Sequence, residues 1–205
     1  MYCRRSRGSV ASLSMATPAP VEPVVRYTVE RYSRLVEEGV LSPDERVELL
    51  EGVIVGMAPH SPRHAAGISC AGQALRVALE DRAAVREQLT LVLGPYSAPE
   101  PDIAVVSGRV EDYYRAHPRA ALLVVEVAET SLAADRLTKA PIYAAARIPE
   151  YWIIDLRHDR IEVFRDPDRK LSRYGSITTT VRGERLELLA LPGVSVAVDD
   201  LIPAR

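Results

Sequence analysis

The feature that most constrains the fold is an apolar segment with an acid inside it. Residues 121–128, Ala-Leu-Leu-Val-Val-Glu-Val-Ala, have the pattern of a buried strand, and Glu126 lies within it. Burial of an unpaired charge costs several kcal/mol, so a cation, a hydrogen-bond network or a metal must accompany this acid. A helix over residues 133–146 and a second buried strand over 151–155 follow. This order predicts two parallel strands joined by a right-handed crossover.

The elements around this unit predict a mixed sheet flanked by helices, in the α/β or α+β class, with further strands at the C-terminal end. Thr28 is expected to cap a helix, and Ser42-Pro43-Asp44-Glu45 to form the capping box of a second, short helix that ends at Gly52. Pro141 is expected to kink or break the later helix. The other expected elements are a helix from about 63 to 82 and strands near 53–57, 89–93, 102–106, 161–165, 175–181, 184–189 and 194–198.

The length of 205 residues suits one domain, and we expect a disordered tail over residues 1–24 and a single domain over residues 25–205. No apolar run approaches the roughly 20 residues of a membrane-spanning helix. Cys3 and Cys70 are not expected to pair, which favours a reducing cytoplasm. The formal charge is −2, and subtracting the net +2 of the first 24 residues leaves about −4. This charge argues against a broad basic surface for nucleic acid, but not against a local basic groove.

Two acids of the predicted sheet are candidates for a shared metal. Asp102 follows Pro101 and opens an apolar strand, whereas Glu126 lies late in another strand. If the two strands are neighbours, the carboxylates meet at one edge of the sheet and repel each other, and a divalent cation relieves that repulsion. Mg²⁺ takes one or two carboxylates and keeps several waters, which leaves positions for a phosphate. The alternatives are that Asp102 caps a turn after the proline and that Glu126 forms an internal salt bridge.

The following helix and the histidines allow both functional and structural interpretations. Asp135 and Lys139 are four residues apart, and their simplest interpretation is a surface ion pair worth a few tenths of a kcal/mol. His64, at the start of a helix, either contacts phosphate, takes part in proton transfer or is structural. No metal-ligand spacing, and hence no structural zinc site, is expected among His60, His117 and His158.

The combined order of these residues resembles a known family. It is similar to the Uma-two family of restriction endonucleases, in the PD-(D/E)XK nuclease-like superfamily. The residues that carry the resemblance are Pro101-Asp102, Val125-Glu126-Val127, Ser131, Asp135, Lys139, Tyr143 and Pro149-Glu150-Tyr151-Trp152. Further upstream, Glu48-Leu-Leu-Glu51-Gly52 followed by Ser61-Pro62-Arg63-His64 is similar to the family's first helix and first strand. The resemblance covers roughly residues 27–165.

The resemblance implies a restriction-endonuclease-like core and cleavage of DNA phosphodiester bonds that depends on Mg²⁺ or Mn²⁺. It implies that Asp102 and Glu126 bind the metal and that Glu48 adds an acid from the early helix. The superfamily places a lysine two residues after the second acid, where this chain has Ala128. On the family pattern, the role of that lysine is taken by Lys139 on the next helix.

The expected function is therefore a metal-dependent DNA endonuclease, for which a homodimer would suit the cutting of both strands. The alternative is a catalytically inactive nuclease-fold protein that acts as a binding or assembly module, which the acidic chain and Ala128 favour. A two-carboxylate hydrolase acting on sugars would need its acids across an open cleft, and nothing in the sequence requires one. Glu51 is the alternative to Glu48 as the acid of the early helix.

Overall fold

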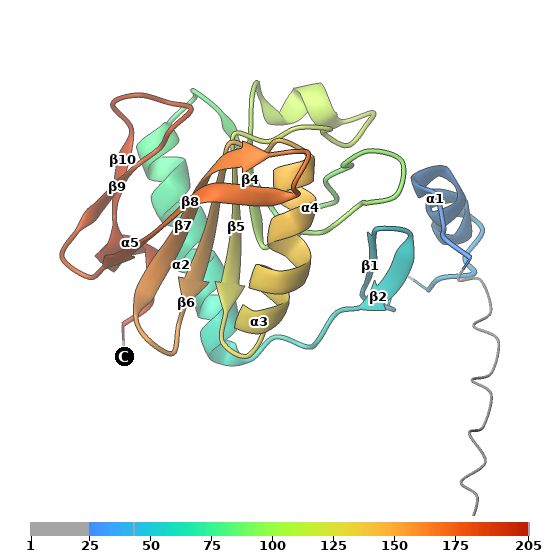
Figure 1. Cartoon of the computed structure of the whole chain (residues 1–205), viewed down its shortest axis with the longest axis horizontal. Helices are drawn as coiled ribbons and strands as arrows, with labels where there is room; N and C mark the ends of the chain where they lie inside the picture. Colours follow the sequence, from blue (N-terminus) through green and yellow to red (C-terminus); the bar gives the residue numbers. More distant parts are fainter. Residues whose placement is uncertain (1–24, 43, 205) are drawn as a thin grey trace, which may run out of the picture.

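The centre of the fold is a six-stranded mixed sheet, seen in a computed structural model that describes residues 25–42 and 44–204 (Figure 1). Within this sheet only β5 and β6 are parallel neighbours, which confirms the predicted fold class and the predicted parallel pairing of these two strands. The expected tail over residues 1–24 lies outside the described residues. In spatial order the strands are β3 (Ala84–Glu87), β4 (Ile103–Val106), β5 (Leu123–Ala128), β6 (Glu150–Asp155), β7 (Arg160–Asp168) and β8 (Arg173–Val181).

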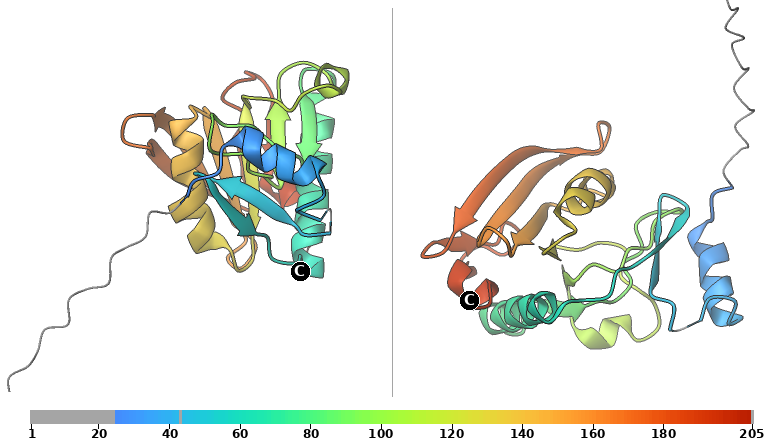
Figure 2. Two further views of the ribbon diagram at one scale, coloured as in Figure 1. Left: turned by 90° about the vertical axis from the view of Figure 1, so that its right-hand side faces the viewer. Right: turned by 90° about the horizontal axis from the view of Figure 1, so that it is seen from below.

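Helices cover both faces of the sheet, and alternate residues of each strand supply the two apolar layers (Figure 2). α2 (Pro62–Leu79) packs on the face to which Val125 and Val127 point. α4 (Ala140–Ala145) packs on the other face, with Val124 and Ala128. Because successive side chains of a strand point to opposite faces, Glu126 lies on the α4 face.

The crossover helix widens just before its proline. It begins as α3 (Leu132–Ala134), continues as a π-helical turn, η2 (Asp135–Lys139), and ends as α4. In the π-turn the backbone N–H of Ala140 donates to the carbonyl of Asp135, five residues earlier. Pro141 has no N–H for the carbonyl four residues before it, and its ring crowds that carbonyl, so a wider turn accommodates it. The expected kink at Pro141 therefore takes the form of a π-turn.

The N-terminal part begins as expected but then departs from the prediction. α1 (Val29–Glu37) starts at Thr28, whose hydroxyl accepts a hydrogen bond from the N–H of Arg31 at 3.3 Å. The predicted second helix is wrong. Its residues form β1 (Val47–Leu50), which pairs antiparallel with β2 (Val53–Gly56).

The capping signal is nevertheless satisfied, by a single turn. The N–H of Ser42 donates to the Glu45 carboxylate at 3.1 Å, and the N–H of Asp44 donates to the Ser42 hydroxyl at 3.2 Å; Pro43 lies outside the described residues. A cap determines only the first turn of a helix. The next residues instead pair with β2, and Leu49 adds a bridge to Ala98, so long-range pairing decides their conformation.

The strand expected at residues 89–93 is also wrong. Leu91 and Leu93 do donate backbone hydrogen bonds, to the carbonyls of Pro99 and Ser97 at 2.9 and 2.8 Å. The returning segment is rich in proline, which removes donors from a ladder, so this stretch is an ordered loop. The edge strand is β3, which the sequence pattern did not predict and which follows directly after α2.

The predicted C-terminal strands are confirmed, and the last two of them lie beside α2 at one side of the molecule (Figure 1). β9 (Arg185–Glu187) and β10 (Ser195–Ala197) pair antiparallel, and α5 (Val198–Leu201) follows them. The loop after β4 contains a short 3-10 helix, η1 (Val110–Tyr113). Among the described residues, no helix has the length and apolar character needed to cross a membrane.

Candidate functional site

The two predicted acids face each other across neighbouring strands. Ile103 of β4 pairs with Val125 of β5, and continuing this antiparallel register by one residue sets Asp102 opposite Glu126. Directly opposed residues of an antiparallel pair point to the same face, with Cβ atoms typically about 5 Å apart. Both side chains are buried, with 5% and 3% of their surface exposed. Continuing the register of β3 by one residue adds Gln88 to this row.

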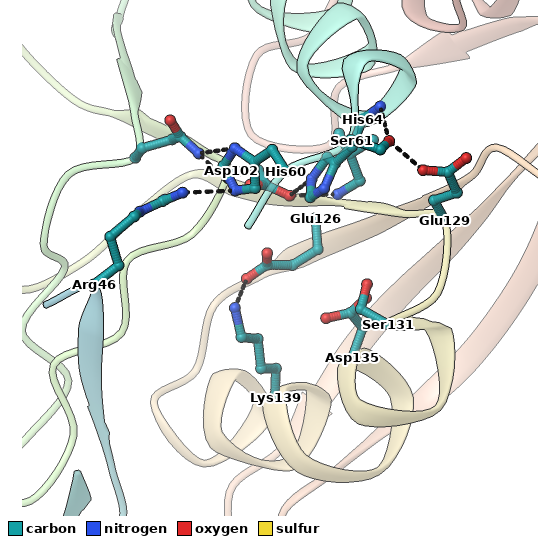
Figure 3. A network of polar contacts seen from close by, with 12 residues as sticks. Arg46, His60, Ser61, His64, Asp102, Glu126, Glu129, Ser131, Asp135 and Lys139 are labelled. Carbon is teal, nitrogen blue, oxygen red and sulfur yellow. Dashed lines mark hydrogen bonds and ion pairs between the residues drawn. The ribbon is translucent and has the colours of Figure 1, made fainter. Parts of the chain in front are cut away.

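Lys139 reaches Glu126 from the crossover helix (Figure 3). Its Nζ lies 3.0 Å from Glu126 Oε1 and 3.4 Å from Glu48 Oε1. Tyr143, one turn further along the helix, donates its hydroxyl hydrogen bond to the same Glu126 oxygen at 2.7 Å. The helix therefore supplies the ammonium, because the residue two positions after Glu126 is Ala128 and has no charged group.

The surface-pair interpretation of Asp135 and Lys139 is wrong, because Asp135 is buried and Lys139 pairs with two other acids. Asp135 is 3% exposed and accepts a hydrogen bond from the Ser131 hydroxyl at 2.7 Å. Lys139 is 13% exposed and makes its ion pairs with Glu126 and Glu48. Both side chains come from the π-turn, a helix irregularity that is frequent at functional sites.

Glu48 reaches the site from a strand and not from the expected helix. One carboxylate oxygen contacts Lys139, and the other accepts the backbone N–H of Glu100 at 3.1 Å. Glu51, the alternative, is exposed at the end of the hairpin. Because side chains alternate along β1, Glu48 is the one that points to Lys139.

A second group of side chains lies on the other side of Asp102. Asp102 Oδ2 accepts the backbone N–H of Val127 at 2.8 Å and lies 3.1 Å from His64 Nε2. The bond to β5 excludes the interpretation that Asp102 only caps a local turn. His64 is held at the start of α2, where its N–H donates to the Ser61 hydroxyl at 3.1 Å.

His60 completes this second group. Its ring lies 4.4 Å from the ring of His64, and one ligand atom each from His60, His64 and Asp102 lie within 4.8 Å of one another. Gln88 and Arg46 both contact the His60 ring at 3.2 Å. The expectation that His60 has no metal-ligand spacing considered only the other distant histidines. The signal was present in the four-residue separation of His60 and His64, which brings both to Asp102.

The electrostatics of the site are dominated by burial and by an excess of acids. Burial raises the pKa of Glu126 to about 8, although Lys139 opposes this shift. Burial alone would lower the pKa of Lys139. The nearby Glu126 and Glu48 carboxylates raise it by more than burial lowers it, so the pKa lies above its ordinary value and the amine stays charged. Burial also raises the pKa of Asp135 to about 6. Glu126 is thus influenced by three other carboxylates, those of Asp102, Asp135 and Glu48, and by one ammonium, and this group of five would carry a net charge of −3 if every acid were ionised.

The donor set fits a divalent cation. Lys139 and Tyr143 occupy one oxygen of Glu126, and His64 and Val127 occupy one oxygen of Asp102. The second oxygen of each acid forms no hydrogen bond with the described residues, so each acid retains a ligand atom. Carboxylate oxygens suit Mg²⁺ or Mn²⁺, and the two neighbouring imidazoles extend the set toward transition metals.

Comparison with known proteins agrees with this architecture. A family model described as "Putative restriction endonuclease", that of Uma2, matches residues 29–199. The chain belongs to the Uma2 family. This match confirms the resemblance drawn from the sequence, and it extends beyond residue 165 through the C-terminal strands.

A solved structure shares the fold of this Uma2 chain. It is the crystal structure of a "putative nuclease belonging to DUF820" from Anabaena variabilis ATCC 29413. The two superpose with a TM-score of 0.66 over 87% of this chain and 97% of the other, at 14% sequence identity. No curated protein matches the chain. The family and the fold are those of a nuclease-like protein.

Proposed function

We propose that this chain is a metal-dependent endonuclease that hydrolyses phosphodiester bonds in DNA. The observation that carries the proposal is the meeting of three predicted side chains on one face of the sheet. The register of β4 and β5, continued by one residue, sets Asp102 opposite Glu126, and Lys139 lies 3.0 Å from Glu126. Membership of the Uma2 family, described as restriction endonucleases, supports the same reaction class.

Asp102 and Glu126 would hold the metal, through the carboxylate oxygens that the protein leaves free. A divalent ion at this place would polarise a phosphoryl oxygen and lower the pKa of a bound water. It would also offset the excess negative charge of the four buried carboxylates. Mg²⁺ and Mn²⁺ are the proposed ions.

Lys139 is proposed to orient the attacking water and to stabilise the negative charge that develops on the phosphate. Glu48 also contacts the ammonium, at 3.4 Å, so it is proposed to position Lys139. Tyr143 fixes the Glu126 carboxylate by donating to one oxygen. His64 holds Asp102 and is the accessory residue of the site.

The second candidate function is a nuclease-fold binding or assembly module without catalysis. The observation that favours it is the closed ion-pair network, in which Lys139 contacts two acids at 3.0 and 3.4 Å. A network of this kind also satisfies the buried charges of a purely structural core. The two functions differ in whether the acids act on a phosphodiester bond.

The experiment that separates them is cleavage of supercoiled plasmid DNA in Mg²⁺ or Mn²⁺. Wild type is compared with Glu126→Gln, and Glu51→Gln serves as the matched control because it removes an exposed acid from the nearby hairpin. We expect wild type and Glu51→Gln to nick the plasmid and chelation to stop them. Glu126→Gln should lose about 100-fold or more, by analogy with removal of one charge-stabilising group.

Equal nicking by wild type and Glu126→Gln would assign the activity to a contaminant or to another site. Folded wild type that binds DNA but leaves it intact in both ions would instead support the binding module. A thermal unfolding curve for each variant separates loss of chemistry from loss of the fold.

A further inference from the structure

Arg86 is a buried cation for which the described part of the chain provides no anion. It lies on β3, and only 9% of its surface is exposed. Its Nε has no hydrogen-bond partner within residues 25–42 and 44–204, and no acid there forms an ion pair with its guanidinium. Its one aromatic contact is the ring of Tyr113, 5.5 Å away. Buried charges are normally paired, so an unpaired guanidinium indicates a missing anionic partner.

The sheet register places Arg86 next to the candidate active site. Arg86 pairs with Ala104 of β4, and Ala104 pairs with Val124 of β5. Asp102 and Glu126 are each two residues further along the same strands, so all these side chains point to the α4 face. Arg86 is therefore a diagonal neighbour of Asp102, and such neighbours are typically about 7–8 Å apart.

Arg86 also lines a cavity of about 840 Å³ between α1, β1 and the loop that contains η1. Arg46 and Arg115 line the same cavity, and its acids are Glu37, Glu45 and Glu100, so with Arg86 the lining carries three arginines and three acids. Glu100 is an acid of this cavity, and the Thr90 hydroxyl donates to it at 3.1 Å. Arg46 and Gln88 also contact His60, so the cavity continues into the second group of the site.

We propose that Arg86 binds a phosphate of the nucleic-acid strand, next to the phosphodiester group that the carboxylates act on. The planar guanidinium presents parallel donors that match two oxygens of a phosphate. Its distance from Asp102 suits a flanking group of the same strand better than the reacting phosphate itself. The assignment to a substrate strand rests on the proposed nuclease function, whereas the need for an anion at Arg86 follows from its burial alone.

The test measures binding without cleavage, by fluorescence anisotropy of a labelled DNA duplex in EDTA. Arg86→Gln, Arg86→Lys and the control Arg173→Gln, which removes an exposed arginine from the opposite edge strand, are compared with wild type. We expect Arg86→Gln to weaken binding about 10-fold, in the range of one charged hydrogen bond. The slope of log affinity against log salt should fall in magnitude by about 0.9, because one phosphate contact is lost. Arg86→Lys should keep most of the slope, and Arg173→Gln should resemble wild type.

A stability measurement excludes a merely structural role. Removing a buried, unpaired charge should leave the melting temperature of Arg86→Gln equal to or above that of wild type. Inorganic phosphate should raise the melting temperature of wild type and not that of Arg86→Gln. A large loss of stability in Arg86→Gln, with no effect of phosphate on wild type, would show that the arginine has a structural partner.

Failure of this inference and failure of the nuclease function give different results. Wild type that binds DNA through Arg86 but never cleaves it would retain the phosphate site and remove the catalytic proposal. Cleavage by Arg86→Gln with an unchanged kcat/KM would retain the catalytic proposal and remove the phosphate site at Arg86. Absence of DNA binding by wild type, with stabilisation by inorganic phosphate alone, would overturn the nucleic-acid assignment.

Discussion

At the scale of single residues, the main feature of the site is that its buried acids outnumber the cations that contact them. Lys139 contacts Glu126 and Glu48, and burial raises the pKa values of Glu126 and Asp135. Each buried carboxylate that lacks a full partner is costly as an anion, and an active site keeps such groups because a metal or substrate completes them. An ionised acid of this kind should therefore lower the stability of the metal-free protein while it strengthens the binding of a cation.

Asp135 should make the metal-free protein less stable as the pH rises. Its pKa is raised by burial from the ordinary 3.8 to about 6, so the folded state holds a proton that the unfolded state has released. Its favourable contribution is complete below pH 3.8 and is lost as the pH passes 6. The raised pKa corresponds to about 3 kcal/mol over this window, at about 1.4 kcal/mol per pKa unit. We expect urea unfolding of Asp135→Asn to lack this decline, and parallel curves for the two proteins would contradict the assignment.

The choice of metal should depend on His64. Two imidazoles lie beside Asp102, and nitrogen ligands favour Mn²⁺ over Mg²⁺. We expect wild type to cleave plasmid DNA faster in Mn²⁺ than in Mg²⁺, and His64→Ala to lose most of this preference, with about 10-fold weaker apparent affinity for Mn²⁺. His158→Ala, an exposed histidine on another loop, is the control. An unchanged preference in His64→Ala would limit the imidazole to holding Asp102.

At the scale of elements, helices and strands present the side chains of the site, and polar side chains form hydrogen bonds at the ends of these elements. The π-turn of η2 presents Asp135 and Lys139, and the sheet presents the opposed acids. On the far side of β6, Asp155 closes the hairpin to β7. It accepts the backbone N–H groups of Arg157 and His158, and it contacts the His158 ring and the Arg160 guanidinium. This hairpin positions the strand that is parallel to β5.

Asp155 should show the opposite pH dependence to Asp135. Burial would raise its pKa, but hydrogen bonds and charges of His158 and Arg160 outweigh burial and lower it. Its stabilisation is therefore present above pH 3.8 and is lost as the pH falls through the lowered value. We expect Asp155→Asn to lower the unfolding free energy by about 1–3 kcal/mol at pH 7, with a smaller difference below pH 3. The check is urea unfolding at both pH values, and a difference that stays constant would contradict it.

At the scale of the whole molecule, charge and symmetry determine how DNA would be engaged. The formal net charge is −2, so contacts to phosphate would have to come from individual cations such as Arg86 and not from a broad basic surface. One active site acts on one strand. Cutting both strands of a duplex calls for a second site, which a two-fold symmetric homodimer would supply.

A homodimer should be detectable both by mass and by its products. We expect sedimentation of the full chain to give twice the mass of one subunit at micromolar concentration. Linear plasmid should then form at a rate that rises more steeply with protein concentration than the nicking rate does. A monomer by mass, with nicked circles as the main product at every concentration, would contradict the dimer.

The sequence alone determined the parts of this protein that depend on local pattern. The strand with Glu126 and the crossover to residues 151–155 follow from apolar periodicity, whereas Asp102 and Lys139 were assigned to the site through the resemblance to a known family. Burial on both faces of β5 needs a long apolar run, and that run is visible without coordinates.

Only the tertiary structure decided which of these residues meet. Glu48 was assigned to a helix because a capping signal preceded it, yet pairing with β2 made its segment a strand. The register of β3, β4 and β5 brings Arg86 close to Asp102, where the described residues supply it with no anion, and the loop before α2 brings His60 to the same acid. Local signals specify single turns, whereas strand pairing and burial are properties of the whole chain, and the site is built from those contacts.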